Sequence, residues 1–242
     1  MLSGRTTLVG LLGDPVAGSL SPRLQNAAFA ALALDWAYVP LPVTADRLAA
    51  AVEGLRAVGF AGANVTIPHK RAAAALCDEL GPEAERAGSV NTLVFAGGRI
   101  VGGSTDAAAL GELAPGRAAV VGAGGAAAAW IDALEQRGAE VRVFSRSGTW
   151  PPETADAELV VQATPVADGL LFEPQPEQAI VDLAYRGDGE PTALAAAARS
   201  AGCKTVVDGL DVLVCQGAAS FERWTGVAAP VDVMRAAVDL RA

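Results

Sequence analysis

The sequence is poor in the residues that build metal centres and disulfide frameworks. Its 242 residues include one histidine and three cysteines, and Cys77, Cys203 and Cys215 lie far apart with no CxxC pair. An odd number of widely separated cysteines argues against a disulfide framework or a zinc site, and it is typical of a reducing compartment. We therefore expect a cytoplasmic protein without a bound metal.

The chain also lacks basic clusters and long apolar runs. A formal net charge of −9 offers no basic face for a nucleic acid. The longest charge-free stretch, residues 118–131, is rich in glycine and too short to cross a bilayer. Gly10, Gly13 and Asp14 interrupt the only apolar run near the start, which excludes a signal-peptide pattern. We expect a globular protein of one large or two modest domains, with no nucleic-acid or membrane partner.

Residues 64–70, Asn-Val-Thr-Ile-Pro-His-Lys, join a β-rich segment (62–67) to an alanine-rich helical run (71–80). Pro68 cannot donate a hydrogen bond to a sheet, so the strand should end there and Lys70 should lie at the sheet edge, at the head of a helix. A lysine in such a place is often only solvated, and a functional role depends on residues elsewhere in the chain. We expect His69 to be exposed or half-packed beside the turn.

Strand and helix signals alternate along the first part of the chain, which predicts a parallel-rich sheet covered by helices. Ser21 is expected to cap a helix whose first residue is Pro22. A hairpin is expected around Gly97-Gly98. The expected strands span 6–12, 38–43, 62–67, 89–94 and 99–102, and the expected helices span 23–34, 45–58, 71–80, 82–86 and 107–113.

A second α/β unit is expected to begin at Ala118, after the boundary signal Pro115-Gly116. Strands are predicted at 119–121, 140–144, 159–163, 180–183 and 205–207, and helices at 128–137, 192–201, 210–224 and 231–240.

The run Gly122-x-Gly124-x-x-Ala127 follows a predicted strand and opens a predicted helix. In that context the first glycine permits a tight turn, and the second lets the backbone approach a pyrophosphate, which the helix N-terminus attracts. The alternative is an ordinary tight turn in a chain rich in alanine and glycine. We interpret the run as a dinucleotide-binding loop.

The end of the next predicted strand bears on the choice of dinucleotide. An NAD site usually has an acidic residue there for the ribose 2′-hydroxyl, whereas this chain has Ser145-Arg146-Ser147. An arginine can hold a 2′-phosphate through its planar fork of donors. This favours NADP, although Arg146 is also compatible with a simple solvated residue.

With these motifs placed, the sequence resembles the shikimate dehydrogenase family over nearly its whole length. Five blocks occur in the family's order: Gly13 to Pro22, Asn64 to Lys70, Val90-Asn91-Thr92, Ser104-Thr105-Asp106 and Asp208 to Gln216.

The resemblance implies an enzyme that reduces 3-dehydroshikimate to shikimate with NADPH, Lys70 and Asp106 being the acid/base pair. It implies an α/β fold with an N-terminal parallel-rich substrate domain, residues 1–105 completed by helices within 211–242, and a shortened Rossmann domain, residues 106–210. The implied substrate-binding residues are Ser19, Ser21, Thr66, Asn91, Asp106, Tyr185 and Gln216. The implied cofactor-binding residues are Gly122, Ala123, Gly124, Gly125, Ala126, Ser145, Arg146, Ser147, Leu183 and Gly209.

Several positions depart from the family pattern. Only residues 148–157 separate the second Rossmann strand from the next apolar run, and a second basic residue for the 2′-phosphate is missing. These departures leave open weak NADP binding, use of NAD, a quinate/shikimate dehydrogenase paralogue, an aminated substrate, or a regulator that binds ligand without turnover. Monomer and homodimer are both compatible with the sequence. The single-residue departures are Gly18 in place of a histidine, Ser104 in place of an asparagine, Ala107 in place of a glycine, and Ala127-Ala128 in place of Ser-Arg.

Overall fold

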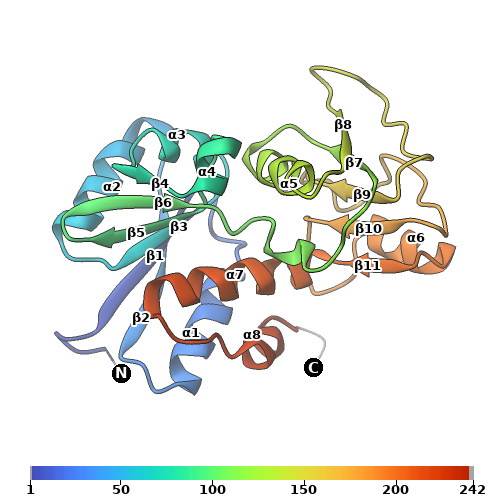
Figure 1. Cartoon of the computed structure of the whole chain (residues 1–242). Coiled ribbons are helices and arrows are strands. Elements are labelled where there is room, and N and C mark those ends of the chain that lie inside the picture. The colour runs from blue at the N-terminus through green and yellow to red at the C-terminus, as the bar shows by residue number, and fades with distance from the viewer. Residues whose placement is uncertain (1, 240–242) are drawn as a thin grey trace. The chain divides into compact units, whose positions relative to one another are not determined.

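The computed structural model describes residues 2–239, which form two compact units (Figure 1). Within the described residues, the first unit consists of residues 2–105 and 214–239, and the second unit is Asp106–Leu213. Both units combine a sheet with helices, so the predicted α/β class is confirmed. Within residues 2–239 no helix combines the length and apolar character that crossing a membrane requires.

The first unit contains a six-stranded sheet with the order β2-β1-β3-β5-β6-β4. Strand β1 pairs in parallel with both β2 and β3, whereas β5 runs antiparallel to β3 and β6. The hairpin predicted around Gly97-Gly98 is the β5–β6 pair. The strands are β1 (Thr7–Gly13), β2 (Trp36–Pro42), β3 (Gly62–Val65), β4 (Glu79–Leu80), β5 (Thr92–Ala96) and β6 (Arg99–Gly103).

Helices from both ends of the chain complete the first unit. The ring of Phe29 in α1 lies 5.3 Å from that of Phe221 in α7, so the C-terminal helices share a core with the N-terminal one. The helices are α1 (Ser21–Ala31), η1 (Ala45–Arg47), α2 (Leu48–Ala57), α3 (Lys70–Ala74), α4 (Pro82–Ala87), α7 (Gly209–Thr225), which begins in the second unit, and α8 (Val231–Val238).

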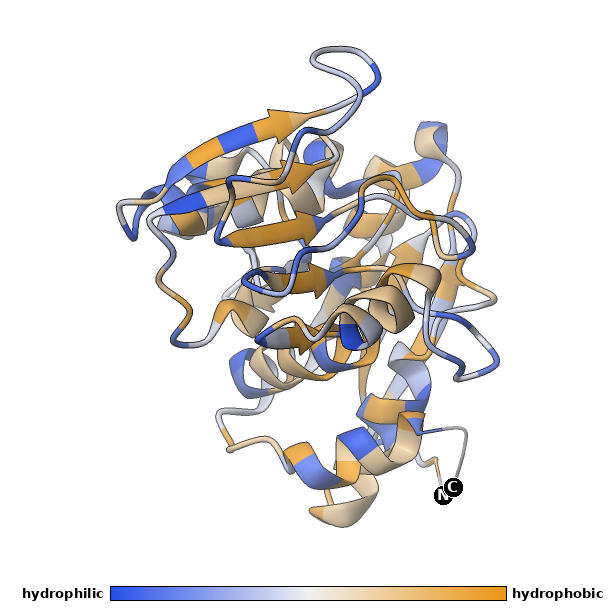
Figure 2. Cartoon of the chain, turned by 90° about the vertical axis from the view of Figure 1, so that its right-hand side faces the viewer, coloured by the Kyte–Doolittle hydropathy of each residue, from blue (hydrophilic) through white to orange (hydrophobic). Residues whose placement is uncertain are grey.

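The second unit is built on a five-stranded sheet with the order β11-β10-β9-β7-β8, in which every pair is parallel. Figure 2 shows that the inner strands are almost wholly hydrophobic, as expected of a sheet covered on both faces. In the edge strand β8, hydrophilic and hydrophobic residues alternate. Its elements are β7 (Arg117–Val121), β8 (Glu140–Phe144), β9 (Leu159–Gln162), β10 (Ala179–Asp182), β11 (Thr205–Val207), α5 (Gly125–Glu135), α6 (Ala193–Ala201) and η2 (Ala108–Leu110).

The connection between β8 and β9 contains no helix, which confirms the trimming expected from its short length. A parallel crossover is usually helical. In this chain β8, an edge strand of the sheet, is instead followed by a loop over residues 145–158, and Arg142 of β8 donates to Glu153 O of that loop.

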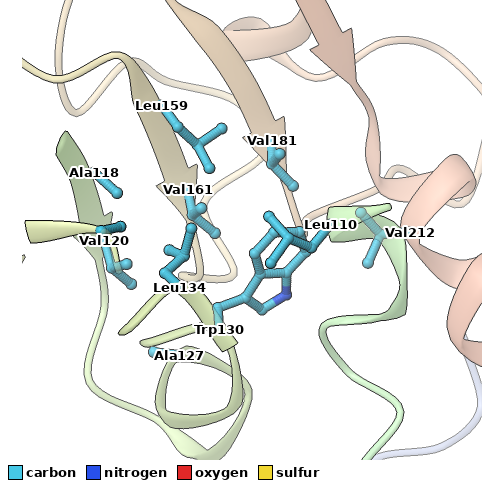
Figure 3. Close-up of a cluster of buried hydrophobic side chains, with 11 residues drawn as sticks. Leu110, Ala118, Val120, Ala127, Trp130, Leu134, Leu159, Val161, Val181 and Val212 are labelled. Atoms are coloured by element: carbon cyan, nitrogen blue, oxygen red, sulfur yellow. The ribbon is translucent and has the colours of Figure 1, made fainter. Parts of the chain in front are cut away.

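The core of the second unit is organised around Trp130 of α5. Its side chain is fully buried among aliphatic residues that include Leu110 of η2, Leu134 of α5 itself and Val181 of β10 (Figure 3). The indole Nε1 has no hydrogen-bond partner among the described residues. Large apolar contact therefore holds this side chain in place without a polar partner.

Several local predictions were wrong. The helix predicted over 71–80 ends at Ala74, because Glu79 and Leu80 pair with β6 as strand β4. The helix predicted over 107–113 is only the 3₁₀ turn η2, which Gly111 ends with a φ of +51°. Ser21 is the first residue of α1 rather than its cap, and its side chain forms no capping bond. Residues 1 and 240–242, which the predicted domains and last helix include, lie outside the described part.

Candidate active-site residues in the two units

Three predicted motifs meet at one end of the first unit's sheet. The backbone N–H of Val65 donates to Asn91 O at 2.8 Å, and that of Asn91 donates to Gly103 O at 3.1 Å. The N–H of Val90 donates to Lys70 O at 2.9 Å. The backbone thus fixes the lysine segment beside the Asn91 segment, and both beside the residues that precede Asp106.

Lys70 is the first residue of α3 and is half-buried, at the strand-to-helix junction predicted for it. The turn before it is closed by the N–H of His69, which donates to Thr66 O at 2.9 Å. His69 itself is buried, contrary to our expectation, with 1% exposure. Its Nε2 lies 2.6 Å from Val43 O, and because a carbonyl can only accept, Nε2 carries the proton. The histidine thus anchors the turn that carries Lys70.

Both polar atoms of the Asn91 amide form hydrogen bonds with Thr105. Asn91 Nδ2 donates to Thr105 Oγ1 at 2.9 Å, and Asn91 Oδ1 accepts from Thr105 N at 2.8 Å. Gln216 Oε1 of α7 lies 3.5 Å from the same Asn91 Nδ2. Two of the predicted substrate-binding residues, Asn91 and Gln216, are therefore neighbours although 125 positions separate them.

A network of buried hydroxyl groups centred on Ser220 lies next to Asn91 and Gln216. Ser220 Oγ donates to Gln216 O at 3.0 Å and lies 2.9 Å from Asn64 Nδ2, 2.9 Å from Thr92 Oγ1 and 3.1 Å from Thr105 Oγ1. Our sequence reasoning missed Ser220. Its position four residues after Gln216, on the same face of a helix, is the signal that could have found it.

Of the predicted carboxylate-binding serines, Ser19 lies in the loop after β1 and Ser21 is the first residue of α1. Ser19 is half-buried and its Oγ accepts from Ser21 N at 3.2 Å, while Ser21 is buried. Thr66 lies against the start of the same loop, since a Cβ added to Gly13 would collide with the Thr66 methyl group. Asp14 N also donates to Ile67 O at 3.0 Å, so the two motifs are adjacent.

Asp106 is the first residue of the second unit and is 7% exposed. The strand that leads to it is pinned by Arg223 of α7, which donates to Glu83 Oε1 at 2.6 Å and to Ser104 O at 3.4 Å. Burial disfavours ionisation of Glu83, but the hydrogen bond and positive charge of Arg223 outweigh it and lower the pKa of this carboxyl. The ion pair therefore secures the chain just before Asp106.

The predicted dinucleotide loop has the geometry that a diphosphate requires. Gly122 follows β7 with a φ of +129°, and a Cβ there would lie 2.7 Å from Ala163 O. Gly124 precedes the first residue of α5, and a Cβ there would meet nothing within 4 Å. The first turn of α5 has no acidic residue and no side-chain cap, and the residues around its start, Ala123, Gly124, Gly125 and Ala126, are all small. These residues fit a dinucleotide diphosphate.

Ser145, Arg146 and Ser147 follow β8 as predicted. The two serine hydroxyls lie 3.3 Å apart, and the Arg146 guanidinium carbon lies 5.9 Å from the centre of the Trp150 ring. Arg146 is exposed, so its donors are accessible to an anion.

Tyr185 and Gly209 line a pocket in the second unit, at the carboxyl ends of β10 and β11. A Cβ on Gly209 would collide with the Ala184 carbonyl, which explains the need for glycine. Leu183 is half-buried just after β10. The buried Asp182 before it accepts from Thr192 Oγ1 at 2.5 Å, yet burial raises its pKa to about 6.

Comparison with known proteins agrees with the motif resemblance. The family model described as Shikimate dehydrogenase substrate binding domain matches residues 11–93, and Shikimate 5'-dehydrogenase C-terminal domain matches residues 209–238. A shikimate dehydrogenase (NADP(+)) of Anaeromyxobacter sp. (strain Fw109-5) is 44% identical over 279 aligned positions, covering 98% of each chain. The chain belongs to the shikimate dehydrogenase family. Because the alignment is longer than the 242 residues present here, the relative carries segments that this family member lacks.

Two solved shikimate dehydrogenases show the same fold. The enzyme of Aquifex aeolicus has a TM-score of 0.89 at 30% identity, over 98% of this chain and 99% of that one. The enzyme of Thermus thermophilus, solved in complex with NADP(H) and shikimate, has a TM-score of 0.84 at 34% identity, over 96% of this chain and 98% of that one.

Proposed function

We propose that the protein is an NADP-dependent shikimate dehydrogenase, which transfers hydride reversibly between NADPH and 3-dehydroshikimate to give shikimate. The first unit would bind the substrate and the second the dinucleotide. The main support is the hydrogen-bonded convergence of the segments that carry Lys70 and Asn91 with the segment leading to Asp106.

In this proposal Lys70 acts as the general acid for ketone reduction. The bound dinucleotide supplies the hydride, and negative charge then grows on the substrate oxygen. The Lys70 ammonium stabilises that charge and donates a proton to the oxygen, and the neutral amine regains a proton from water. Asp106 orients the ammonium and the hydroxyl. In the oxidative direction Lys70 accepts the proton instead.

The remaining predicted residues would recognise the substrate. Ser19 and Ser21 would donate hydroxyl hydrogen bonds to its carboxylate, each contributing about 1.5–3 kcal/mol as bonds to a charged group. Thr66, Asn91, Tyr185 and Gln216 would bond the ring hydroxyls and the carboxylate. Buried polar groups of this kind discriminate strongly, because a ligand lacking the matching hydroxyl leaves them unpaired.

The second unit would hold the dinucleotide through backbone and small side chains. Residues 122–126 would surround the diphosphate, Ser145, Arg146 and Ser147 would contact the 2′-phosphate, and Leu183 and Gly209 would line the nicotinamide end. A phosphate is bound by N–H donors that have no acidic group nearby. The first turn of α5 supplies such donors, since it contains no acidic residue.

Two alternatives rest on the shortened β8–β9 connection and the single basic residue after β8. One is a quinate/shikimate dehydrogenase paralogue with relaxed use of NAD and NADP, and the other is a regulator that binds ligand without turnover. We expect a cytoplasmic enzyme, as a monomer or homodimer.

An activity grid separates these functions. Purified protein is assayed by dinucleotide absorbance with shikimate or quinate, each with NADP or NAD. The proposal expects the highest kcat/KM with shikimate and NADP. Comparable rates with quinate or with NAD would support the paralogue. Measurable binding of shikimate without turnover in any combination would support the regulator.

A further inference from the structure

The loop after β8 brings an aromatic ring back to the arginine at the strand end. Gly148 N donates to Ser145 O at 3.0 Å, and Ser145 N donates to Thr149 O at 3.1 Å. These two bonds close a tight loop, and the next residue, Trp150, then lies against Arg146 with 5.9 Å between the guanidinium carbon and the ring centre.

The far side of this loop is also fixed to the strand. Arg142 of β8 donates to Glu153 O at 3.0 Å and pairs with Asp156. Trp150 is therefore held between two anchored points. It nevertheless stays 39% exposed, which is unusual for so large an apolar side chain.

The contact with Trp150 leaves the N–H donors of the Arg146 guanidinium accessible. A guanidinium that lies over a ring uses its face, while its N–H donors point outward in the plane of the group. Within the described residues Arg146 forms no ion pair, so no carboxylate occupies those donors. Arg146 can therefore meet an anion while its guanidinium remains over the Trp150 ring.

We propose that Trp150 is a positioning residue that sets the preference for the 2′-phosphorylated dinucleotide. Where this chain lacks a second basic residue, the indole would restrict Arg146 to the conformation that grips the 2′-phosphate. The inference rests on the proposed NADP site. Since the contribution of an exposed cation–π contact is modest, its loss should weaken binding about two- to fivefold.

The test measures binding of fragments rather than turnover. Titration calorimetry with 2′,5′-ADP and with 5′-AMP is done on the full chain and on Trp150→Leu, Trp150→Phe and Arg146→Gln. We expect Trp150→Leu to weaken binding of 2′,5′-ADP about two- to fivefold without a change in 5′-AMP affinity, and Trp150→Phe to retain most of the affinity. In the Arg146→Gln background the Trp150→Leu change should have little further effect.

Three results would overturn the inference. The first is an unchanged affinity of Trp150→Leu for 2′,5′-ADP. The second is an equal loss of affinity for both ligands, which would mean that the ring only contacts the adenine. The third is an effect of Trp150→Leu that is as large in the Arg146→Gln background as in the wild type. If the wild-type protein itself showed no preference for 2′,5′-ADP over 5′-AMP, the NADP site would fail as well. A wild-type preference that ignores Trp150 would refute this inference alone.

Discussion

The amide of Asn91 holds Thr105 through both of its polar atoms, at 2.9 Å to the hydroxyl and 2.8 Å from the backbone N–H. Thr105 is the last residue of the first unit before Asp106. One side chain thus fixes the segment from which the proposed catalytic carboxylate emerges. Ser220 reinforces that segment from α7.

Removing the Ser220 hydroxyl should destabilise the first unit. Ser220→Ala leaves buried polar groups of Asn64, Thr92 and Thr105 with one partner fewer, so we expect the free energy of unfolding to fall by about 1–3 kcal/mol. Urea unfolding measures this. Ser200→Ala, a matched change at an exposed helical position, is the control, and a Ser220→Ala loss no larger than that of the control would contradict the prediction.

Lys70→Ala should reduce kcat about 10²–10⁴-fold, because it removes the proposed proton donor, with a smaller effect on shikimate binding. Steady-state kinetics and calorimetric titration of shikimate separate the two effects. Arg71→Ala, the adjacent exposed cation on α3, should leave kcat within about twofold of wild type. Full kcat in Lys70→Ala would remove the lysine from the mechanism.

The two loop glycines should respond differently to a methyl group. Gly122→Ala forces a side chain to a φ of +129° against the Ala163 carbonyl, so we expect about 1–3 kcal/mol lower stability. Gly124 has an ordinary φ of −80° and open space, so Gly124→Ala should change stability by less than about 0.5 kcal/mol.

Dinucleotide binding provides the second measurement on this pair. Because its methyl group would occupy the approach to the diphosphate, Gly124→Ala should weaken NADP binding while it unfolds like the wild type. Thermal unfolding together with NADP titration tests both variants. Equal stability losses in the two, or unimpaired NADP binding by Gly124→Ala, would count against this view of the loop.

Asp182 should give the protein a distinctive response to pH. Burial raises its pKa to about 6, so the folded protein binds a proton that the unfolded chain has already released between about pH 4 and 6. Its contribution to stability is present below this window and is lost as pH rises through it, at no more than about 1.4 kcal/mol per pH unit.

Asp182→Asn tests this contribution, since it cannot ionise. Urea unfolding between pH 4.5 and 6.5 should show stability that rises more, or falls less, with pH in the variant than in the wild type. Parallel pH profiles for the two proteins would show that Asp182 stays ionised throughout this range.

Local signals in the sequence predicted most elements of the fold. The Gly122 loop, the β5–β6 hairpin and the helix-free β8–β9 connection follow from glycine positions and segment length. The failures depend on distant contacts. The buried His69 donates a hydrogen bond to the carbonyl of Val43, and residues 79–80 form a strand because β6 lies beside them.

The candidate site also combines residues that local motifs predicted with one residue that only distant contacts bring into place. Motif order identified Lys70 and Asn91, because each lies within a short characteristic block. Ser220 escaped notice, since its partner Asn64 lies 156 positions away and only the folded chain brings them together.

Phe221, Trp224 and Met234 are buried parts of the first unit although they come from the last tenth of the chain. A ribosome therefore delivers the whole second unit before the first can close its core. We expect a chain truncated near residue 213 to expose apolar surface of its N-terminal sheet to chaperones and proteases, because the side chains that complete this core are missing.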